Sequence, residues 1–223
     1  MTDTMDSTEQ RERASTDPAA TSAREVYHLL NSIVVPRPIA WVSTYSPTGV
    51  ANVAPHSYCM IVSANPPIIA FSSTGAKDTL RNVRATGAFA FNHVAGALAE
   101  PMNLSSADFP PDMSEFDWAG VTPVPAVAVD APRVAESPAA LECRVRDIQT
   151  FGGGNDPSHL VIGDVVHITV DAALLRDGIL DDARTQPVGR FARAQFAHSR
   201  DFFEIPRPTY RGLLDAGVRP QRG

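Results

Sequence analysis

Short runs of alternating apolar and polar residues dominate the chain from residue 39 onward, and this period of two is typical of half-buried β-strands. Residues that favour turns separate the runs, and Ser46-Pro47-Thr48-Gly49 between the first two runs predicts a β-hairpin. The pattern predicts strands at 39–45, 50–58, 67–73, 88–93, 140–151 and 159–170.

Helical patterns are inserted between these strands. They predict helices over 24–31, where Val26, Leu29 and Leu30 share a face, over 77–85, and over 95–104 with a kink at Pro101. The proline-rich segment 105–139 is predicted to be a long wrapping loop with short extended pieces. About six strands with short inserted helices and no βαβ rhythm predict a mainly β fold, an antiparallel barrel.

The chain of 223 residues has the length of one domain with appendages. Residues 1–22 are rich in Thr, Ser, Asp and Glu, and this composition predicts a disordered N-terminal tail. Residues 23–204 form the predicted barrel domain. Residues 205–223 are rich in Pro and Arg and are predicted to be an irregular C-terminal tail.

Charge and composition exclude several functional classes. The net charge of −6 argues against nucleic acid or an anionic membrane as a partner. No run of 18 apolar residues predicts a membrane span, and residues 1–22 lack the apolar core of a signal peptide. Cys59 and Cys143 form no CxxC motif, so we expect reduced thiols and a cytoplasmic location. The histidines show no ligand spacing, so no metal site is predicted.

The segment around Lys77 indicates a phosphate site. Lys77 is the only lysine among 19 basic residues. It stands between a hydroxyl-rich loop and a predicted helix start, whose free N–H groups attract anions. The cradle predicted for a phosphate monoester is Ser72, Ser73, Thr74, Gly75, Lys77 and Thr79. The alternative is that Thr74 or Asp78 only caps the helix. Because Asp78 would repel a phosphate, we expect its side chain to point elsewhere.

Five motifs follow one another between residues 37 and 92: Arg37-Pro38-Ile39-Ala40-Trp41-Val42-Ser43-Thr44, Asn52-Val53-Ala54-Pro55-His56-Ser57-Tyr58, Asn65-Pro66-Pro67, Lys77-Asp78-Thr79-Leu80-Arg81-Asn82 and Phe91-Asn92. In this order the sequence resembles the flavin reductase family with an FMN-binding split barrel, which includes reductase components of two-component monooxygenases and flavoredoxin-like proteins. The resemblance continues through Glu115-Phe116 and Ile162-Gly163-Asp164-Val165 and covers about residues 25–195.

The resemblance implies an antiparallel split β-barrel that forms a homodimer and binds FMN or FAD where two subunits meet. It implies hydride transfer from NAD(P)H to the flavin, with reduced flavin passed to a partner monooxygenase. Two alternatives stay open: an FMN-binding electron carrier without NAD(P)H activity, and an FMN enzyme that acts directly on an organic substrate. Because hydride transfer between two rings needs stacking and no acid or base, no catalytic side chain is assigned.

Residues 54–57 suit the edge of a flavin ring, because small residues and an edge proline let a flat ring approach the backbone. The complete predicted flavin site is Arg37, Ser43, Thr44, Asn52, Ala54, Pro55, His56, Ser57, Ser72, Ser73, Thr74, Lys77, Asp78, Thr79, Asn92 and Arg190.

Two segments depart from the family pattern. Gly163-Asp164-Val165 replaces a Gly-Asp-His triplet whose histidine lies near the nicotinamide. In the closing segment 189–196, Ala192-Arg193 and Phe196 replace paired glycines and a tyrosine. We expect Gly163, Val165 and residues 190–196 to shape a slot for the nicotinamide.

Overall fold

The computed structural model describes residues 14–154 and 156–219. The tail predicted at 1–22 therefore lies largely outside the described residues. Its last residue, Ser22, is the N-cap of the first helix, α1 (Ala23–Ile33), and forms a reciprocal capping box with Glu25. This cap explains why the helix begins close to the predicted position.

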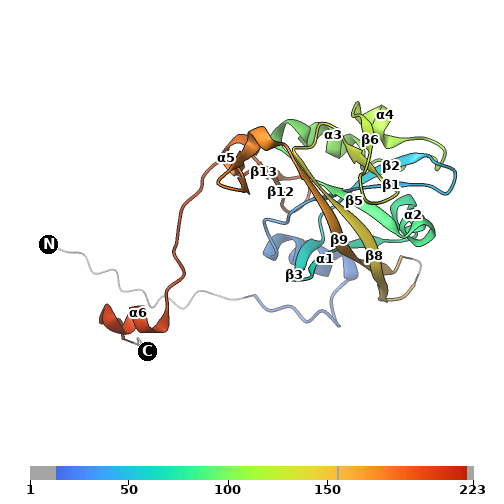
Figure 1. Cartoon of the computed structure of the whole chain (residues 1–223). Coiled ribbons are helices and arrows are strands. Elements are labelled where there is room, and N and C mark those ends of the chain that lie inside the picture. The colour runs from blue at the N-terminus through green and yellow to red at the C-terminus, as the bar shows by residue number, and fades with distance from the viewer. Residues whose placement is uncertain (1–13, 155, 220–223) are drawn as a thin grey trace.

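The centre of the molecule is a curled antiparallel sheet of seven strands in the order β2-β1-β5-β8-β9-β4-β3 (Figure 1). The strands are β1 (Ala40–Tyr45), β2 (Ala51–His56), β3 (Cys59–Ala64), β4 (Pro67–Thr74), β5 (Ala88–Asn92), β8 (Ala139–Phe151) and β9 (Ser158–Val170). All pairings between neighbouring strands are antiparallel. The predicted mainly β, antiparallel split barrel is confirmed.

Both faces of β1 are buried, so its side chains enter two separate cores. Trp41 packs with Val53 and Phe116 in one core, while Val42 packs with Phe71 and Phe89 in the other. Helix α2 (Asp78–Thr86) closes the second core with Leu80 and Val83. The short helix η1 (Gly96–Leu98) and α3 (Ala99–Leu104) close the first with Leu98 and Met102. This double burial fixes β1 at the centre of the barrel.

The strand β3 was not predicted from the sequence. Its residues Met60, Ile61 and Val62 are consecutive apolar residues without a polar alternation, and all three are exposed on the edge of the sheet. The predicted packing of α1 is also corrected, because Leu29 and Leu30 are exposed and only Asn31 of this helix is buried. The described chain leaves the apolar side of this helix uncovered.

The predicted loop 105–139 holds more structure than expected. It contains α4 (Glu115–Ala119) and a small sheet of β6 (Pro123–Pro125) and β7 (Pro132–Val134). Two buried side chains hold β7 against the barrel: the Ser43 hydroxyl donates to the Pro132 carbonyl, and the Asn92 carbonyl accepts from the Val134 amide. The segment is therefore an integral wall of the barrel.

The chain after β9 forms small elements that cover one end of the barrel. They are η2 (Ala172–Leu174), β10 (Leu175–Arg176), β11 (Ile179–Leu180), α5 (Asp182–Thr185), β12 (Val188–Arg190) and β13 (Phe196–His198). The tail predicted as irregular contains α6 (Tyr210–Asp215), which Thr209 caps through the Gly212 amide and which lies apart from the barrel in Figure 1. This cap is the local reason for the correction.

The barrel is open along the seam between β2 and β4. Here the link is a side-chain contact: Nδ1 of His56 on β2 lies 3.3 Å from the Ser72 carbonyl oxygen on β4. Polar groups of β2 and β4 therefore face the space between the two strands. No helix in the described part of the chain is long and apolar enough to cross a membrane.

Candidate functional site

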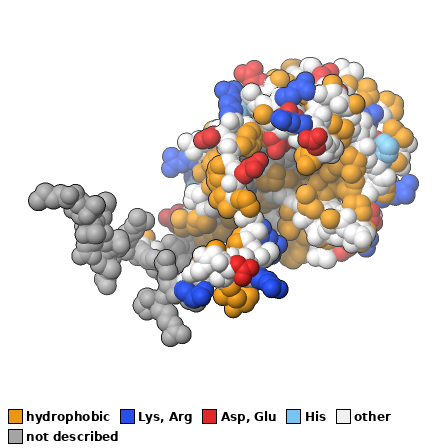
Figure 2. All heavy atoms as spheres, turned by 60° about the vertical axis from the view of Figure 1, so that its left-hand side comes forward, with side chains coloured by type: hydrophobic (Ala, Val, Ile, Leu, Met, Phe, Trp, Pro, Cys, Tyr) orange, Lys and Arg blue, Asp and Glu red, His pale blue; other side chains and the backbone are white. Residues whose placement is uncertain are grey.

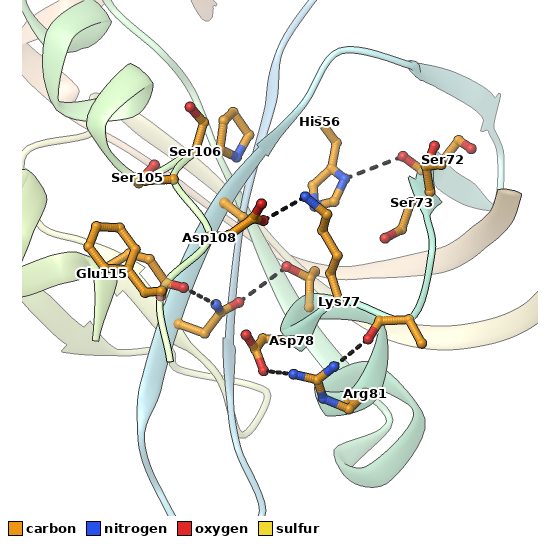
Figure 3. Close-up of a pocket in the computed structure, with 18 of the residues that line it drawn as sticks. His56, Ser72, Ser73, Lys77, Asp78, Arg81, Ser105, Ser106, Asp108 and Glu115 are labelled. Carbon is orange, nitrogen blue, oxygen red and sulfur yellow. Dashed lines mark hydrogen bonds and ion pairs between the residues drawn. The ribbon is translucent and has the colours of Figure 1, made fainter. Parts of the chain in front are cut away.

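A cavity of about 660 Å³ lies along this seam. Five parts of the chain enclose it: Tyr27 on α1, β2 and the turn after it, the end of β4, the start of α2, and the segment 105–115 on the opposite side. Figure 3 shows Ser72, Ser73 and Lys77 facing Ser105, Ser106 and Asp108 across this space. The cavity therefore brings together segments that are far apart in the sequence.

The phosphate cradle predicted from the sequence lies at one end of this cavity. Strand β4 ends at Thr74, and Gly75, with φ +71°, turns the chain into α2. The Gly75 amide donates to the Pro157 carbonyl, which holds the turn in place. Lys77 is the N-cap of α2 and makes no side-chain capping bond. Neither Thr74 nor Asp78 caps the helix, so the free N–H groups of its first turn are available to an anion.

Both basic side chains beside the cradle have carboxylate partners. Lys77 Nζ donates to Asp108 Oδ1 at 2.9 Å, and this hydrogen bond holds the pKa of Asp108 below its usual value. Asp78 pairs with Arg81 one turn further along α2 (Figure 3). The Asp78 carboxylate thus has a basic partner on its own helix, although Asp78 also lines the cavity.

Two buried polar atoms of the cavity wall have no hydrogen-bond partner within the described chain, Ser73 Oγ and His56 Nε2. Burial and the nearby charge of Lys77 lower the pKa of His56 to about 4, so this imidazole is neutral at pH 7. With the Ser72 carbonyl oxygen beside Nδ1, the proton sits on Nδ1 and Nε2 is an acceptor. Buried polar atoms without partners are uncommon, and both of these are free to bond to a ligand in the cavity.

A buried network fixes the wall between cradle and seam. Asn52 Nδ2 donates to Glu115 Oε1 at 2.8 Å, and Glu115 Oε2 accepts from the Val53 amide at 3.1 Å. The hydroxyls of Thr44 and Thr79 both donate to Asn52 Oδ1 at 3.2 Å. Burial raises the pKa of Glu115. Asn52 and Thr79 thus line the cavity while their side chains hold β1, β2, α2 and α4 together.

Most of the predicted site residues line this one cavity: Asn52, Ala54, Pro55, His56, Ser57, Ser72, Ser73, Thr74, Lys77, Asp78 and Thr79. Arg37 and Arg190 line a second, adjoining cavity instead. Ser43, Thr44 and Asn92 line neither cavity, because β1 and β5 are buried on both faces and their polar side chains bond within the barrel. These three belong to the frame of the site.

Sequence reasoning missed the opposite wall of the cavity. This wall includes Ser105, Ser106, Ala107, Asp108, Phe109, Pro111 and Glu115. Tyr27 on α1, Tyr58 in the turn after β2, and Ala76 and Arg81 near the start of α2 also line the cavity and were not predicted. The run of small and polar residues after α3 was a visible signal, but nothing local indicated that this segment folds across the start of α2. The described residues contain no group of three or more His, Cys, Asp and Glu side chains placed to hold a metal ion.

The predicted nicotinamide slot is corrected in part. Gly163 lies in the middle of β9, where a Cβ atom would come 2.5 Å from Cζ of the buried Phe89. This glycine therefore permits a close approach inside the core and lines neither cavity. Val165 is likewise absent from both cavity walls, whereas Arg190, Phe191, Arg193 and Phe196 line the second cavity.

The fold and the cavity define a class: an antiparallel split barrel whose seam presents hydroxyls, an uncapped helix start and a lysine to the cavity. The family model described as "Flavin reductase like domain" matches residues 32–188, and the chain belongs to this family. An uncharacterized protein of Halalkalibacterium halodurans is 39% identical over 200 residues, which cover 86% of this chain and 96% of the relative.

Solved structures agree with this assignment. Nitrilotriacetate monooxygenase component B from Bacillus cereus is similar, with a TM-score of 0.84 and 31% identity over 87% of this chain and 99% of its own. The 2-nitrobenzoate 2-nitroreductase of Pseudomonas fluorescens has a TM-score of 0.82 and 26% identity, covering 94% and 100% of the two chains. Flavoredoxin of Desulfovibrio vulgaris (Miyazaki F) has a TM-score of 0.69 and 25% identity, covering 86% and 97%.

Proposed function

We propose that this protein is an NAD(P)H:flavin oxidoreductase that binds FMN or FAD in the cavity along the β2–β4 seam. The observation that carries the proposal is the pair of buried atoms without partners, Ser73 Oγ and His56 Nε2, in the wall of the same cavity as the open start of α2. A flavin nucleotide has a ring with donors and acceptors at one edge and a phosphate at the other end. The residues present fit both ends.

When bound, the flavin supplies the hydride-accepting chemistry, and the protein supplies binding and orientation. Ser73, Lys77 and the first-turn amides of α2 would hold the phosphate. The backbone at residues 54–57 would meet the ring edge, with neutral His56 as a hydrogen-bond acceptor. Asn52 and Glu115 would position the flavin indirectly, because their hydrogen bond fixes the cavity wall. None of these side chains is required to move a proton during hydride transfer.

A partner monooxygenase is part of the proposal. Its support is the similarity to nitrilotriacetate monooxygenase component B over 87% of this chain. A second candidate function, an FMN enzyme acting directly on an organic substrate, is favoured by two observations. Val165 stands where the family triplet has a histidine, and a nitroreductase is similar over 94% of this chain. The similarity to flavoredoxin supports the electron carrier in the same way.

One assay separates these functions. Purified protein with excess FMN or FAD receives NADH or NADPH, and absorbance of the nicotinamide is followed. A reductase oxidises the nicotinamide with many turnovers of free flavin. An electron carrier binds flavin but oxidises no more nicotinamide than a protein-free control. An enzyme acting on an organic substrate needs a nitroaromatic or other acceptor for turnover. Failure to bind either flavin would contradict all three.

Homodimerisation is also proposed, because the described chain leaves two apolar surfaces uncovered. The edge strand β3 exposes 61% of Met60, 76% of Ile61 and 48% of Val62, and α1 exposes 71% of Ile33. Exposed apolar edge strands are pairing sites. Figure 2 shows hydrophobic side chains gathered around a hollow on one face of the molecule. Light scattering at low micromolar concentration should give a dimer, and Ile61→Lys should weaken it. A monomer that binds FMN tightly would contradict the proposal.

A further inference from the structure

A second cavity of about 240 Å³ adjoins the proposed flavin cavity and shares Tyr27, Pro55, Ser57 and Ser106 with it. We call it the arginine annex, after Arg37, Arg190 and Arg193 in its wall. Its remaining wall includes the apolar side chains of Ile39, Phe191 and Phe196. Because Pro55 and Ser57 belong to the segment 54–57 assigned to the flavin ring edge, the annex opens beside the reacting end of the proposed flavin.

The charge of the annex is one-sided. Its lining contains three arginines and His28 but no Asp or Glu, although the whole chain has a net charge of −6. None of the three arginines forms an ion pair with a carboxylate of the described residues. Arg37 is buried and Arg190 half-buried, whereas Arg193 is exposed. A positive group withdrawn from water without a counter-ion is unfavourable, so Arg37 and Arg190 indicate a site for an anionic ligand.

Arg37 is held rigidly and still has a free donor. Its two terminal nitrogens donate to the carbonyls of Asn31, Val34 and Phe191 at 2.8–2.9 Å, while its buried Nε–H has no partner within the described chain. Residue 37 is only 6% exposed. The guanidinium is therefore a fixed, buried positive charge in the wall of the annex.

Arg190 lies directly beside Arg37. The two backbones form a bridge, with N–O distances of 3.0 and 2.9 Å in the two directions. The Arg190 guanidinium lies 4.3 Å from the centroid of the Phe196 ring, which holds it in the annex wall. Burial and the charge of Arg37 lower the pKa of Arg190, as expected for two like charges without a carboxylate between them.

We propose that the arginine annex binds the anionic group, a phosphate or a carboxylate, of the second redox substrate and holds that substrate against the flavin ring. The inference rests on the proposed function, since it assigns the flavin to the adjoining cavity. At about 240 Å³ the annex is smaller than pockets that enclose drug-sized ligands. It therefore takes one anionic group and the ring or chain next to it, with Ile39, Phe191 and Phe196 against the apolar part.

Two sources of this anion are separable by experiment: a phosphate of NAD(P)H, or the carboxylate of an aromatic acid. The probes are inorganic phosphate and benzoate, titrated by calorimetry into FMN-loaded protein, whose cradle at Lys77 is already filled. The Michaelis constants for NADH and NADPH are measured in parallel. Stronger binding of phosphate, with the Michaelis constant dependent on Arg190, identifies the nicotinamide nucleotide. Stronger binding of benzoate, with that constant unchanged, identifies an organic acid.

The test variant is Arg190→Gln, which should weaken the preferred probe at least about tenfold, the effect of losing one charged hydrogen bond. Arg190→Lys, which keeps the charge, should restore most of the affinity. Arg176→Gln on exposed β10 makes the same charge change away from both cavities and should have no effect. Arg193→Asn is a second variant, because asparagine tolerates the φ of +55° at this position.

The proposal would be overturned if Arg190→Gln and Arg193→Asn both bind phosphate, benzoate and NADH within twofold of the unmodified protein. It would also be overturned if Arg190→Gln weakens FMN more than either probe, because the annex would then belong to the flavin. Failure of the proposed function has a different signature: the unmodified protein would bind no flavin. In that case the probes can be titrated into the flavin-free Lys77→Ala variant. This variant lacks the lysine of the cradle, so the binding measured is that of the annex.

Discussion

The cradle at the start of α2 and the arginine annex are adjoining basic sites, yet they balance their charges in opposite ways. In the cradle, Lys77 pairs with Asp108 and Arg81 pairs with Asp78. In the annex, neither Arg37 nor Arg190 has a carboxylate partner among the described residues. The side chains of Lys77 and Asp108 are exposed, whereas Arg37 is buried and held by three carbonyls.

This difference in charge balance determines how each site would bind an anion. An exposed ion pair contributes little to stability, so a phosphate can displace Asp108 from Lys77 at a small cost. The described lining of the annex has no carboxylate to displace, and the buried Arg37 gains the full interaction with a ligand. We therefore expect the cradle to exchange its phosphate readily and the annex to select for charge.

The largest expected effect is a loss of folding stability at acidic pH, and it comes from the neutral imidazole of His56. Its folded pKa of about 4 lies below the unfolded value of 6.5, so the unfolded chain binds the proton more readily. The stabilisation is present above pH 6.5 and is lost as the pH falls from 6.5 to 4, by on the order of 3 kcal/mol.

Urea unfolding of the protein and of His56→Phe at pH 7, 5.5 and 4 measures this loss, and NMR titration of the imidazole gives its pKa. Phenylalanine keeps the packing against Phe71, whose ring centroid lies 4.8 Å from that of His56. A His56 pKa near 6.5 would show that the cradle holds a second titrating cation.

The next effect is on flavin affinity. Lys77→Ala should weaken FMN by about 1.5–3 kcal/mol, because a charged hydrogen bond to the phosphate is lost. Riboflavin, which lacks the phosphate, should lose far less, and Lys77→Arg should keep most of the FMN affinity. Fluorescence titration of both flavins measures the difference. Equal losses for FMN and riboflavin would remove Lys77 from the phosphate cradle.

A substitution outside both cavities should change stability alone. Gly163→Ala introduces a Cβ atom 2.5 Å from Phe89 Cζ and should destabilise the protein by about 1–3 kcal/mol, the usual effect of overpacking. The Michaelis constants for flavin and NADH should stay within twofold, measured below the unfolding transition. A selective loss of NADH oxidation in a fully stable variant would return Gly163 to the nicotinamide slot predicted from the sequence.

The smallest expected effect is on FMN affinity, and it tests directly whether the Asp108 carboxylate competes with the ligand for Lys77. Asp108→Asn removes the carboxylate that competes for Lys77 and should tighten FMN binding only slightly, because an exposed ion pair is weak. Asp112→Asn, on the same segment but outside the cavity lining, makes the same charge change as a control. Weaker FMN binding in Asp108→Asn alone would show that Asp108 holds the ligand.

Local chemistry explains which parts of the fold were predictable. The β1–β2 hairpin and the long strands β8 and β9 carry turn residues and apolar periods within one short window. Strand β3 carries no such period, because Met60, Ile61 and Val62 face the outside of the described chain. For β3 the decisive interaction is pairing with β4, which no local pattern encodes.

The sequence by itself determined the barrel class, the family and the end of the cavity that carries Lys77, because the loop before α2 concentrates hydroxyls, a glycine and the single lysine next to a helix start. Tertiary structure alone decided the rest of the site. It folded residues 105–115 over α2, turned Ser43, Thr44 and Asn92 into the barrel, and placed Arg190 beside Arg37. The physical reason is that cavity walls form from residues far apart in the chain, and only the closure of the barrel sets their distances.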